Sequence, residues 1–352
     1  MVERVQTAAM LVLVATCACV HAASDDRFDD AHFHLTDWVQ EGVTAREVLS
    51  MMGKRVSRST LFGIPLQQQW SYRASGTRAP TSYLDSDAPL YYYSFTDAVI
   101  AQAYLSLPPA DRARFDPMIT GFNPADMYAA DHVRRVLETY PGVFSGIGEF
   151  TVQKAVVSSK VAGEPTSLDD PALDRLFDFA AQVGLVVLIH TDIHGERAGD
   201  RAYLARAKVL FARHPKVTFI WAHTGFSGAI EPLEDHLATL TELLEDRTLA
   251  HVAFDLSWDR LADQLVASND TARLTAGTIE RYPERFLFGT DNVAPPDRAS
   301  YYAAFDQYRP LWKALSPRAS ELVRFGNYER IFDAARRDVR RWEKKHVRRR
   351  KG

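Results

Sequence analysis

Cysteine is almost absent from this sequence, and its position limits what it can do. The 352 residues include two cysteines, Cys17 and Cys19, and both lie in the first 22 residues. If that segment is removed, the remaining chain has no thiol, which excludes disulfides and cysteine metal ligands. The chain also lacks a glycine-rich phosphate loop after its first predicted strand and any internal repeat. Because 46% of the residues are hydrophobic and 25% are charged, disorder, collagen and coiled coil are excluded.

The first 22 residues have the pattern of a secretory signal peptide. A basic residue precedes an apolar stretch at residues 8–20, and a cleavage site with small outer residues ends at Ala22. The stretch is too short to span a bilayer as a mature helix. We therefore expect a periplasmic or secreted protein with no transmembrane segment after cleavage. A buried N-terminal helix is one alternative, and lipidation at Cys17 is another, although Thr16 precedes it where Gly, Ala or Ser is usual.

Positive charge is concentrated at the C-terminus. Residues 336–351 contain ten Lys or Arg against Asp338 and Glu343, a charge of +8, and residues 1–22 contribute zero. With a net charge of −3 for the whole chain, the body at 23–335 carries −11. We divide the chain accordingly into a signal peptide at 1–22, an enzyme body at 23–335 and a basic tail at 336–352. The acidic body argues against a nucleic-acid enzyme, so no nucleic-acid partner is expected. The tail could contact anionic lipid or nucleic acid, or be a solvated helix end.

Short apolar runs alternate with amphipathic segments through the body. The runs are typical of buried parallel strands and lie at 28–35, 59–66, 117–122, 144–150, 185–192, 217–225, 251–258 and 286–292. The helical patterns lie near 44–53, 97–106, 125–139, 171–183, 200–213, 229–245, 259–281 and 299–315. Asn123, Asp170 and Asp297 stand at helix starts as caps. Eight repeats of strand and helix predict an α/β fold, a (β/α)₈ TIM barrel, with a doubly wound open sheet as the alternative. A C-terminal helix from Tyr328 onward should pack outside the barrel.

Two connections are too long to be plain loops. Residues 67–93 contain Trp70, Tyr72, Tyr83 and three consecutive tyrosines, and residues 151–169 follow the fourth strand. Loops of this length are usually functional or disordered. The first is interpreted as a lid or a wall of the substrate site, or as an insertion packed on the side of the barrel.

Ionisable residues end several of the predicted strands. The ends carry His32 and His34, Glu149, His190, His223 and Asp291. His32 and His34 point to one face of a strand because side chains alternate, so both can grip one divalent metal. Taken singly, a histidine here could be a core residue and Asp291 a helix cap. Taken together, they lie where barrel enzymes build their sites, and burying so many ionisable groups without a cation is costly.

These motifs resemble a known family. Asp-Ala-His-Phe-His at 30–34, Ile-His-Thr-Asp at 189–192, Trp-Ala-His-Thr-Gly at 221–225 and Phe-Gly-Thr-Asp at 288–291 look like the amidohydrolase superfamily. They look most like its amidohydrolase-related branch, which includes lactonases, other hydrolases and non-oxidative decarboxylases. The similarity spans roughly residues 28–332, and the segment at 325–332 resembles the one that closes members of this branch.

The resemblance implies a role for each position. His32, His34, His190 and Asp291 match metal ligands. His223 matches either a ligand of a second metal or a catalytic histidine that polarises the scissile carbonyl. Glu149 matches a position where some relatives carry a bridging carboxylate or a modified lysine. If Glu149 bridges, two metals could bind, with His190 and His223 shared by the second. If Glu149 only forms a hydrogen bond nearby, one metal is held and His223 is free to act.

The ligand set suits a divalent metal, Zn²⁺ first, as one or two ions. Such an ion activates water, Asp291 can take the proton of that water, and His223 or the metal stabilises the oxyanion. We therefore expect a hydrolase that cleaves an ester, lactone or amide bond in a small-molecule substrate. A decarboxylase on the same scaffold and a non-enzymatic metal-binding envelope protein are the alternatives. Homo-oligomerisation stays open.

Four residues are candidates for substrate binding. Lys154 follows Glu149 and could recognise a carboxylate, or be a surface lysine. Asp192 lies near the barrel mouth and could contact substrate or cap the next helix. Asp255 and Trp258 end the seventh strand, where substrate contact and packing are both open.

Overall fold

The computed structural model describes residues 26–83, 86–163, 165–195, 201–226 and 232–347. The expected signal peptide and the last five residues of the tail lie outside the described residues. Within the described ranges, no helix combines the length and the apolar composition needed to cross a membrane.

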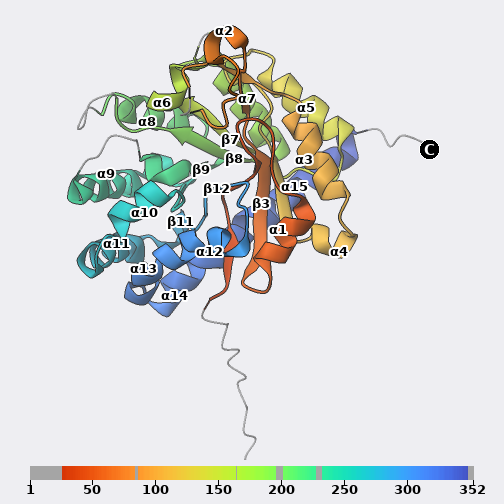
Figure 1. The fold of residues 1–352 in the computed structure, drawn as a ribbon. Coiled ribbons are helices and arrows are strands. Elements are labelled where there is room, and N and C mark those ends of the chain that lie inside the picture. Colours follow the sequence, from red (N-terminus) through yellow and green to blue (C-terminus); the bar gives the residue numbers. More distant parts are fainter. Residues whose placement is uncertain (1–25, 84–85, 164, 196–200, 227–231, 348–352) are drawn as a thin grey trace, which may run out of the picture.

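The strands form a parallel barrel, as the sequence predicts (Figure 1). Its strands are β1 (Phe28–Asp30), β2 (Phe33–Thr36), β3 (Val56–Gly63), β6 (Phe115–Ile119), β7 (Gly146–Gln153), β8 (Val186–Thr191), β9 (Thr218–Trp221), β10 (Val252–Asp255), β11 (Phe286–Leu287) and β12 (Asn292–Val293). β1 and β2 are two parts of the first barrel strand, and β11 and β12 are two parts of the eighth. The barrel closes because β11 pairs with β10 while β12 pairs with β2, both in parallel. The open-sheet alternative is therefore wrong.

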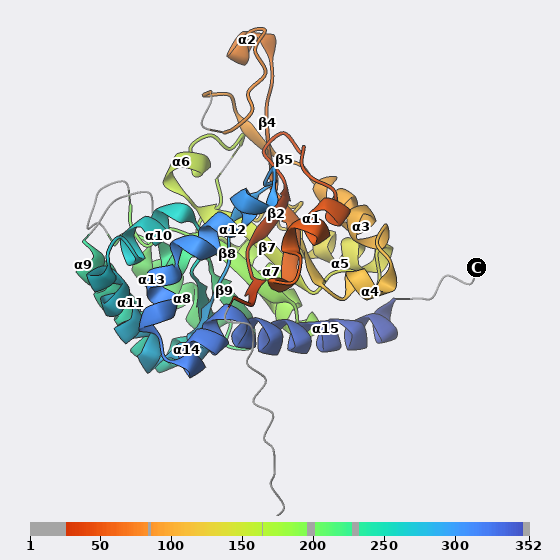
Figure 2. The same cartoon turned by 60° about the horizontal axis from the view of Figure 1, so that its bottom comes forward.

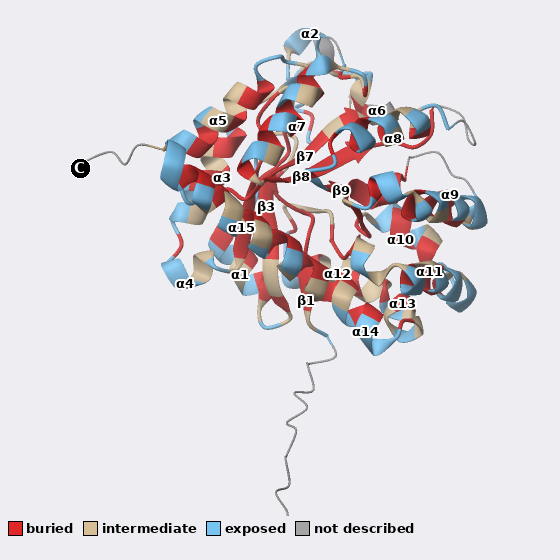
Figure 3. Ribbon diagram, turned by 180° about the vertical axis from the view of Figure 1, so that it is seen from behind, coloured by how far each residue is buried: buried red, intermediate tan, exposed pale blue. Residues whose placement is uncertain are grey.

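Helices cover the outside of the barrel, with buried sides against the strands and exposed sides toward solvent (Figure 3). The longer ones are α1 (Ala45–Met52), α3 (Thr96–Leu105), α5 (Ala129–Thr139), α7 (Pro171–Val183), α8 (Leu204–Arg213), α9 (Leu233–Glu245), α10 (Asp259–Leu265), α11 (Asn269–Arg281), α12 (Arg298–Gln307), α13 (Arg309–Ala314) and α15 (Asn327–His346). Short helices complete the set: α2 (Tyr72–Ser75), α4 (Pro109–Arg112), α6 (Ala155–Ser158) and α14 (Pro317–Glu321).

Local capping explains where several helices begin. The Asp170 side chain accepts from the backbone N–H of Ala172 at the start of α7, as the sequence predicts. The pattern predicted as one helix over 259–281 is instead two helices, α10 and α11. Ser268 divides them, because its side chain forms a capping box with Thr271 and begins a new helix.

The apolar core has two layers separated by the barrel wall. The outer layer packs the strands against the surrounding helices, and the inner layer fills the barrel. Four residues of α15 belong to the inner layer: Tyr328, Ile331, Phe332 and Ala335. The C-terminal helix therefore does more than lie outside the barrel, because it plugs the end opposite the strands' carboxyl ends (Figure 2).

Polar contacts fix α15 in this position. The buried carboxylate of Asp116 at the start of β6 accepts hydrogen bonds from the Tyr328 hydroxyl at 2.8 Å, from Arg58 at 2.9 Å and from Arg336. Arg340 donates to the backbone oxygen of Phe144, just before β7, at 2.8 Å. The division of the chain at residue 335 thus falls inside a continuous helix, and part of the expected tail belongs to the barrel.

Candidate metal centre

Six ionisable side chains meet at the carboxyl end of the barrel. His32 and His34 come from the first strand, Glu149 from β7 and His190 from β8, while His223 follows β9 and Asp291 lies between β11 and β12. The four histidines and Glu149 are buried, and the Asp291 side chain is 17% exposed. All six predicted metal-site residues are therefore in one cluster.

Glu149 lies at the centre of the four imidazoles. Its Oε1 is 2.8 Å from His190 Nδ1 and 3.5 Å from His223 Nε2. Its Oε2 is 3.6 Å from His32 Nε2 and 3.5 Å from His34 Nε2. Each carboxylate oxygen thus faces a different pair of histidines, which is the arrangement that a bridging carboxylate requires.

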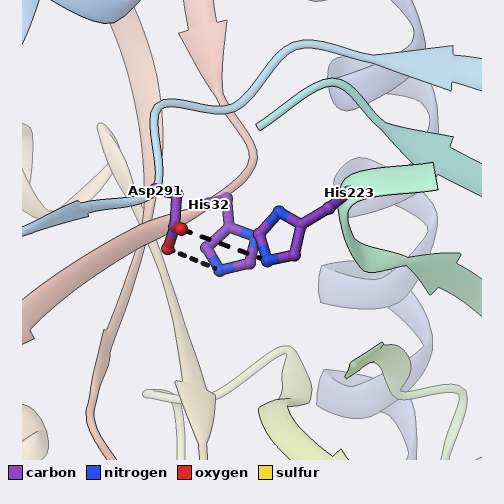
Figure 4. A group of neighbouring side chains, drawn as sticks. All are labelled: His32, His223 and Asp291. Atoms are coloured by element: carbon purple, nitrogen blue, oxygen red, sulfur yellow. Dashed lines mark ion pairs between the residues drawn. The ribbon is translucent and has the colours of Figure 1, made fainter. Parts of the chain in front are cut away.

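Asp291 closes the cluster from the eighth strand. Its Oδ1 is 3.3 Å from His32 Nε2, and its Oδ2 is 4.0 Å from His223 Nε2 (Figure 4). The same Oδ1 is also 3.3 Å from His34 Nε2. The carboxylate therefore reaches the first-strand histidines and the sixth-strand histidine at the same time.

The donor atoms fit a divalent cation. Three overlapping groups have potential ligand atoms within 4.8 Å of one another: His32, His223 and Asp291; His32, His34 and Glu149; and Glu149, His190 and His223. The Nε2 atom of the buried His32 has no hydrogen-bond partner among the described residues, although it points into the cluster. Imidazole and carboxylate donors suit Zn²⁺ and related ions. Metal binding by these residues stays a prediction that this geometry supports.

Electrostatics show that the cluster favours positive charge. Burial lowers the pKa of His32, but the charges of Asp291, Asp255 and Glu149 outweigh burial and hold that pKa well above its usual value. Burial raises the pKa of Glu149, but His32 and hydrogen bonds from His190 and His223 bring it well below its usual value. The pKa of Asp291 is lowered by His32, His34 and His223 against the effect of burial. Both carboxylates are thus held ionised in a buried place, as cation binding needs.

His223 differs from the other histidines of the cluster. Burial lowers its pKa, and the opposing effects of Glu149, Asp291 and Asp255 do not restore it. Its imidazole is therefore neutral at pH 7. A neutral ring can bind a metal or take part in proton transfer, so both predicted roles of His223 remain compatible with its surroundings.

Unusual backbone conformations aim these side chains. His223, Trp258 and Asp291 have φ values of 53°, 77° and 53°, in the left-handed region that non-glycine residues rarely adopt. Such conformations cost about 1–3 kcal/mol each and cluster at functional sites. Gly148 has φ +115°, and an added Cβ would lie 2.0 Å from the backbone oxygen of Leu188. Only glycine fits beside β8 there, one residue before Glu149.

Asp255 supports the cluster from behind. Its Oδ2 is 2.9 Å from His32 Nδ1, and its Oδ1 accepts from the backbone N–H of His223 at 2.8 Å. It also accepts from the Ser257 hydroxyl, whose oxygen is 2.8 Å from His223 Nδ1. Asp255 is fully buried and orients two histidines, so the structure favours packing over the substrate contact that the sequence left open. In the sequence, the signal for a role of Asp255 at the site was its position at the end of the seventh predicted strand.

A cavity of about 580 Å³ opens directly above the cluster. His34, Glu149 and Asp291 line its floor, and Lys154 and Trp258 are part of its wall. The Lys154 Nζ atom lies 5.6 Å from the centre of the Trp258 ring. Burial lowers the pKa of Lys154, but Glu149, Tyr83, Asp291 and Asp192 raise it above its usual value, so the amine is charged. Among the described residues that line the cavity, Lys154 is the one basic side chain of the Lys or Arg type.

The candidate Asp192 has a different position from Lys154 and Trp258. Asp192 is buried, and its Oδ1 lies 3.2 Å from His190 Nε2. It does not belong to the described lining of the cavity. Contact of Asp192 with substrate stays a prediction, whereas its contact with His190 is observed.

Both long connections build the cavity wall. Residues 67–93 form an antiparallel hairpin of β4 (Leu66–Gln68) and β5 (Leu90–Tyr92), and Leu66, Tyr83 and Leu90 line the cavity. Lys160 ties the second connection to the first, because its Nζ donates to the backbone oxygens of Tyr83 at 2.7 Å and Ser86 at 2.8 Å. These contacts support the interpretation of residues 67–93 as a wall of the substrate site. The outer end of this connection, which carries α2, projects above the mouth of the barrel (Figure 2).

Comparisons with known proteins agree with the motifs. The sequence model of a family described as Amidohydrolase matches residues 29–334. A search of curated proteins found no match. Among solved structures, the chain is similar to a zinc-bound amidohydrolase from Burkholderia multivorans, with 15% identity, a TM-score of 0.54 and coverage of 87% of this chain and 99% of that one. It is also similar to an uncharacterised TIM-barrel protein from Bordetella bronchiseptica, with 14% identity, a TM-score of 0.53 and coverage of 88% and 99%. At these identities the two structures show the shared fold.

Proposed function

The chain belongs to the amidohydrolase family, and from this premise we propose that it is a metal-dependent hydrolase that cleaves an ester, lactone or amide bond in a small molecule. The observation that supports the proposal best is the meeting of four histidines with Glu149 and Asp291 at the floor of one cavity. In this proposal His32, His34 and Asp291 would hold a first divalent ion, with Zn²⁺ as the first choice. His190 and His223 would hold a second ion, and Glu149 faces both pairs of histidines. A bound ion supplies Lewis acidity, which polarises a substrate oxygen and makes a water more acidic.

The chain's own residues supply the proton transfers. The lowered pKa of Asp291 keeps its carboxylate ionised, so it can accept a proton from the attacking water and pass it to the leaving group. If one ion alone is bound, the Nε2 atom of the neutral His223, which faces Asp291 and Glu149, is free to act. With its proton on Nε2, His223 can then donate to the oxygen on which negative charge develops.

Lys154 and Trp258 are proposed to orient the substrate. The charged Lys154 lies in the cavity wall and can pair with an anionic group of the substrate, while the Trp258 ring offers a flat apolar surface. Binding energy at these remote groups would place the scissile carbonyl over the metal ligands.

A substitution at Asp291 tests the proposal. Asp291→Asn keeps the size of the side chain but removes the base, so turnover should fall by about 10³-fold or more while circular dichroism stays unchanged. Asp297→Asn is a matched control, because Asp297 follows the same strand but caps α12 in solvent, where Asn caps equally well. An Asp291→Asn enzyme that keeps its rate would remove Asp291 from the mechanism.

Metal and product analysis separate the competing functions. Purified protein should contain one or two equivalents of divalent metal by elemental analysis, and none would refute the metal proposal. In a screen of lactones, esters, amides and aromatic acids, ring opening or bond cleavage supports the hydrolase. Release of CO₂ without cleavage identifies the decarboxylase instead. Loss of metal in His34→Ala, with no turnover of any compound by the unaltered chain, would favour a metal-binding envelope protein.

A further inference from the structure

The structure divides the basic residues of the C-terminus into two groups. Arg336 donates to the buried Asp116, and Arg340 pairs with Glu343 and donates to the backbone of Phe144. These two arginines attach α15 to the barrel and are not available to a partner. The other four Lys and Arg residues of the segment that the structure describes have a different position.

A basic face, made of Arg337, Arg341, Lys344 and Lys345, points into solvent. The side chains of Arg337 and Arg341 are 63% and 61% exposed, and both lysines are exposed as well. The four residues fall on one side of the helix because their spacing follows its period. The sequence then adds Arg348, Arg349, Arg350 and Lys351 directly after the described residues.

Little negative charge opposes this face within its own segment. Asp338 lies 3.0 Å from Arg341 and 3.9 Å from Arg337, and Glu343 is buried beside Arg340. Residues 336–351 contain no carboxylate besides these two, and Asp333, one turn before Arg337, is paired with Arg58. The rest of the body, at 23–335, carries −11. Positive charge is thus concentrated at one end of an acidic molecule.

The basic face lies away from the cavity. The apolar side of α15 is buried against the barrel, and the helix runs along the end opposite the hairpin that walls the mouth (Figure 2). A partner on the basic face would leave the cavity open to solution. It would also meet charge and almost no exposed apolar surface from α15, since Val339 and Trp342 are buried.

We propose that the basic face docks this protein on an anionic phospholipid bilayer, with the barrel mouth turned away from the lipid. Clusters of this size on an amphipathic helix are attracted to anionic membranes, and each added basic residue strengthens the attraction. A planar membrane can touch the basic end alone. A long nucleic acid would also run past the acidic body and be repelled by it. Because the apolar side of α15 is buried, the attachment is electrostatic and reversible by salt.

Vesicle sedimentation tests the proposal with the full chain. Binding is measured on vesicles of phosphatidylglycerol and phosphatidylcholine and on vesicles of phosphatidylcholine alone, which report any contribution of the apolar residues 8–20. The tail variant replaces six cations by Gln: Lys344, Lys345, Arg348, Arg349, Arg350 and Lys351. We expect it to bind anionic vesicles at least about 100-fold more weakly than the unaltered chain. Binding of the unaltered chain should disappear near 1 M salt, where screening shortens to about 3 Å.

A second variant controls for net charge. It replaces six exposed cations elsewhere on the molecule by Gln: Arg46, Lys54, Arg73, Arg78, Lys216 and Arg273. This variant has the same net charge as the tail variant and should keep its binding to anionic vesicles. Equal loss in both variants, unchanged binding of the tail variant, or equal binding to neutral vesicles would overturn the proposal. Tighter binding to duplex DNA than to anionic vesicles would also overturn it and identify a nucleic-acid partner. Unchanged thermal unfolding shows that the comparison is between folded proteins.

Discussion

Asp255 shows how much of this site depends on a residue outside the cluster itself. Its carboxylate contacts His32 Nδ1 and the backbone of His223, and it is fully buried. A hydrogen bond at the far nitrogen of a ligating histidine fixes the ring orientation and makes the ring a better donor. Asp255 is therefore a positioning residue for both histidines.

Substitution of Asp255 should weaken metal binding. Asp255→Asn keeps an oxygen to accept from His223 but loses the charge beside His32, so metal affinity should fall about 10–100-fold. Competition with a chromophoric chelator measures this change, and activity at saturating metal should recover in large part. Asp263→Asn, on the exposed side of α10, is the matched control. Wild-type metal affinity in Asp255→Asn would limit Asp255 to a packing role.

Asp29 offers a test of pH dependence away from the site. Burial raises its pKa to about 7 from 3.8, although Arg27 opposes the shift. A raised carboxyl pKa means that the folded state binds the proton more tightly than the unfolded state. Its contribution to the free energy of unfolding is therefore largest below pH 4 and is lost as the pH rises to about 7.

Asp29→Asn removes this titration and keeps an oxygen to accept from the backbone of Arg58. Relative to the unaltered chain, the variant should gain up to about 4 kcal/mol in unfolding free energy between pH 4 and pH 8. Urea unfolding at several pH values in this range measures the difference. A difference that is constant with pH would contradict the assigned pKa.

Helix α15 is the element whose role is least visible from its pattern. Its amphipathic period predicts a helix packed on the outside of the barrel, but Phe332 is fully buried in the inner layer of the core. A residue that fills the end of the barrel contacts several strands at once. Its removal leaves a cavity that the closed sheet cannot collapse to fill.

Phe332→Ala should therefore destabilise the protein by about 3–5 kcal/mol. Arg337→Ala, on the exposed side of the same helix, should change the unfolding free energy by less than about 0.5 kcal/mol. Chemical unfolding of both variants measures the contrast. Similar small effects in the two would mean that α15 adds little to the stability of the barrel.

At the scale of the whole molecule, the candidate metal ligands connect distant parts of the chain. They come from five different barrel strands, including the first and the eighth, where β2 and β12 close the sheet. Because these residues meet only when the barrel is folded, an ion held by them would bind the folded state and not the unfolded chain. The stability of the whole barrel should thus depend on metal.

Metal removal by a chelator should lower the thermal unfolding temperature. At a free Zn²⁺ concentration 100 times the Kd, linkage predicts about 2.7 kcal/mol of stabilisation, which corresponds to roughly 4 °C for a chain of this length. Scanning calorimetry with chelator and with added Zn²⁺ measures the shift, and His34→Ala should show little of it. An equal shift in His34→Ala would place the metal elsewhere.

The sequence by itself determined those features of the protein that depend on interactions between residues close together in the chain. Apolar runs, capping residues such as Asp170, and alternation at His32 and His34 act over a few residues, so the order of strands and helices and the six candidate ligands could be predicted. The tertiary structure decided what depends on residues far apart in the chain. The contact of His32 with Asp255 spans 223 positions and needs the closed barrel. The division of the C-terminal cations between the barrel and solvent depends on which face of α15 is buried, because packing alone determines which charges remain exposed.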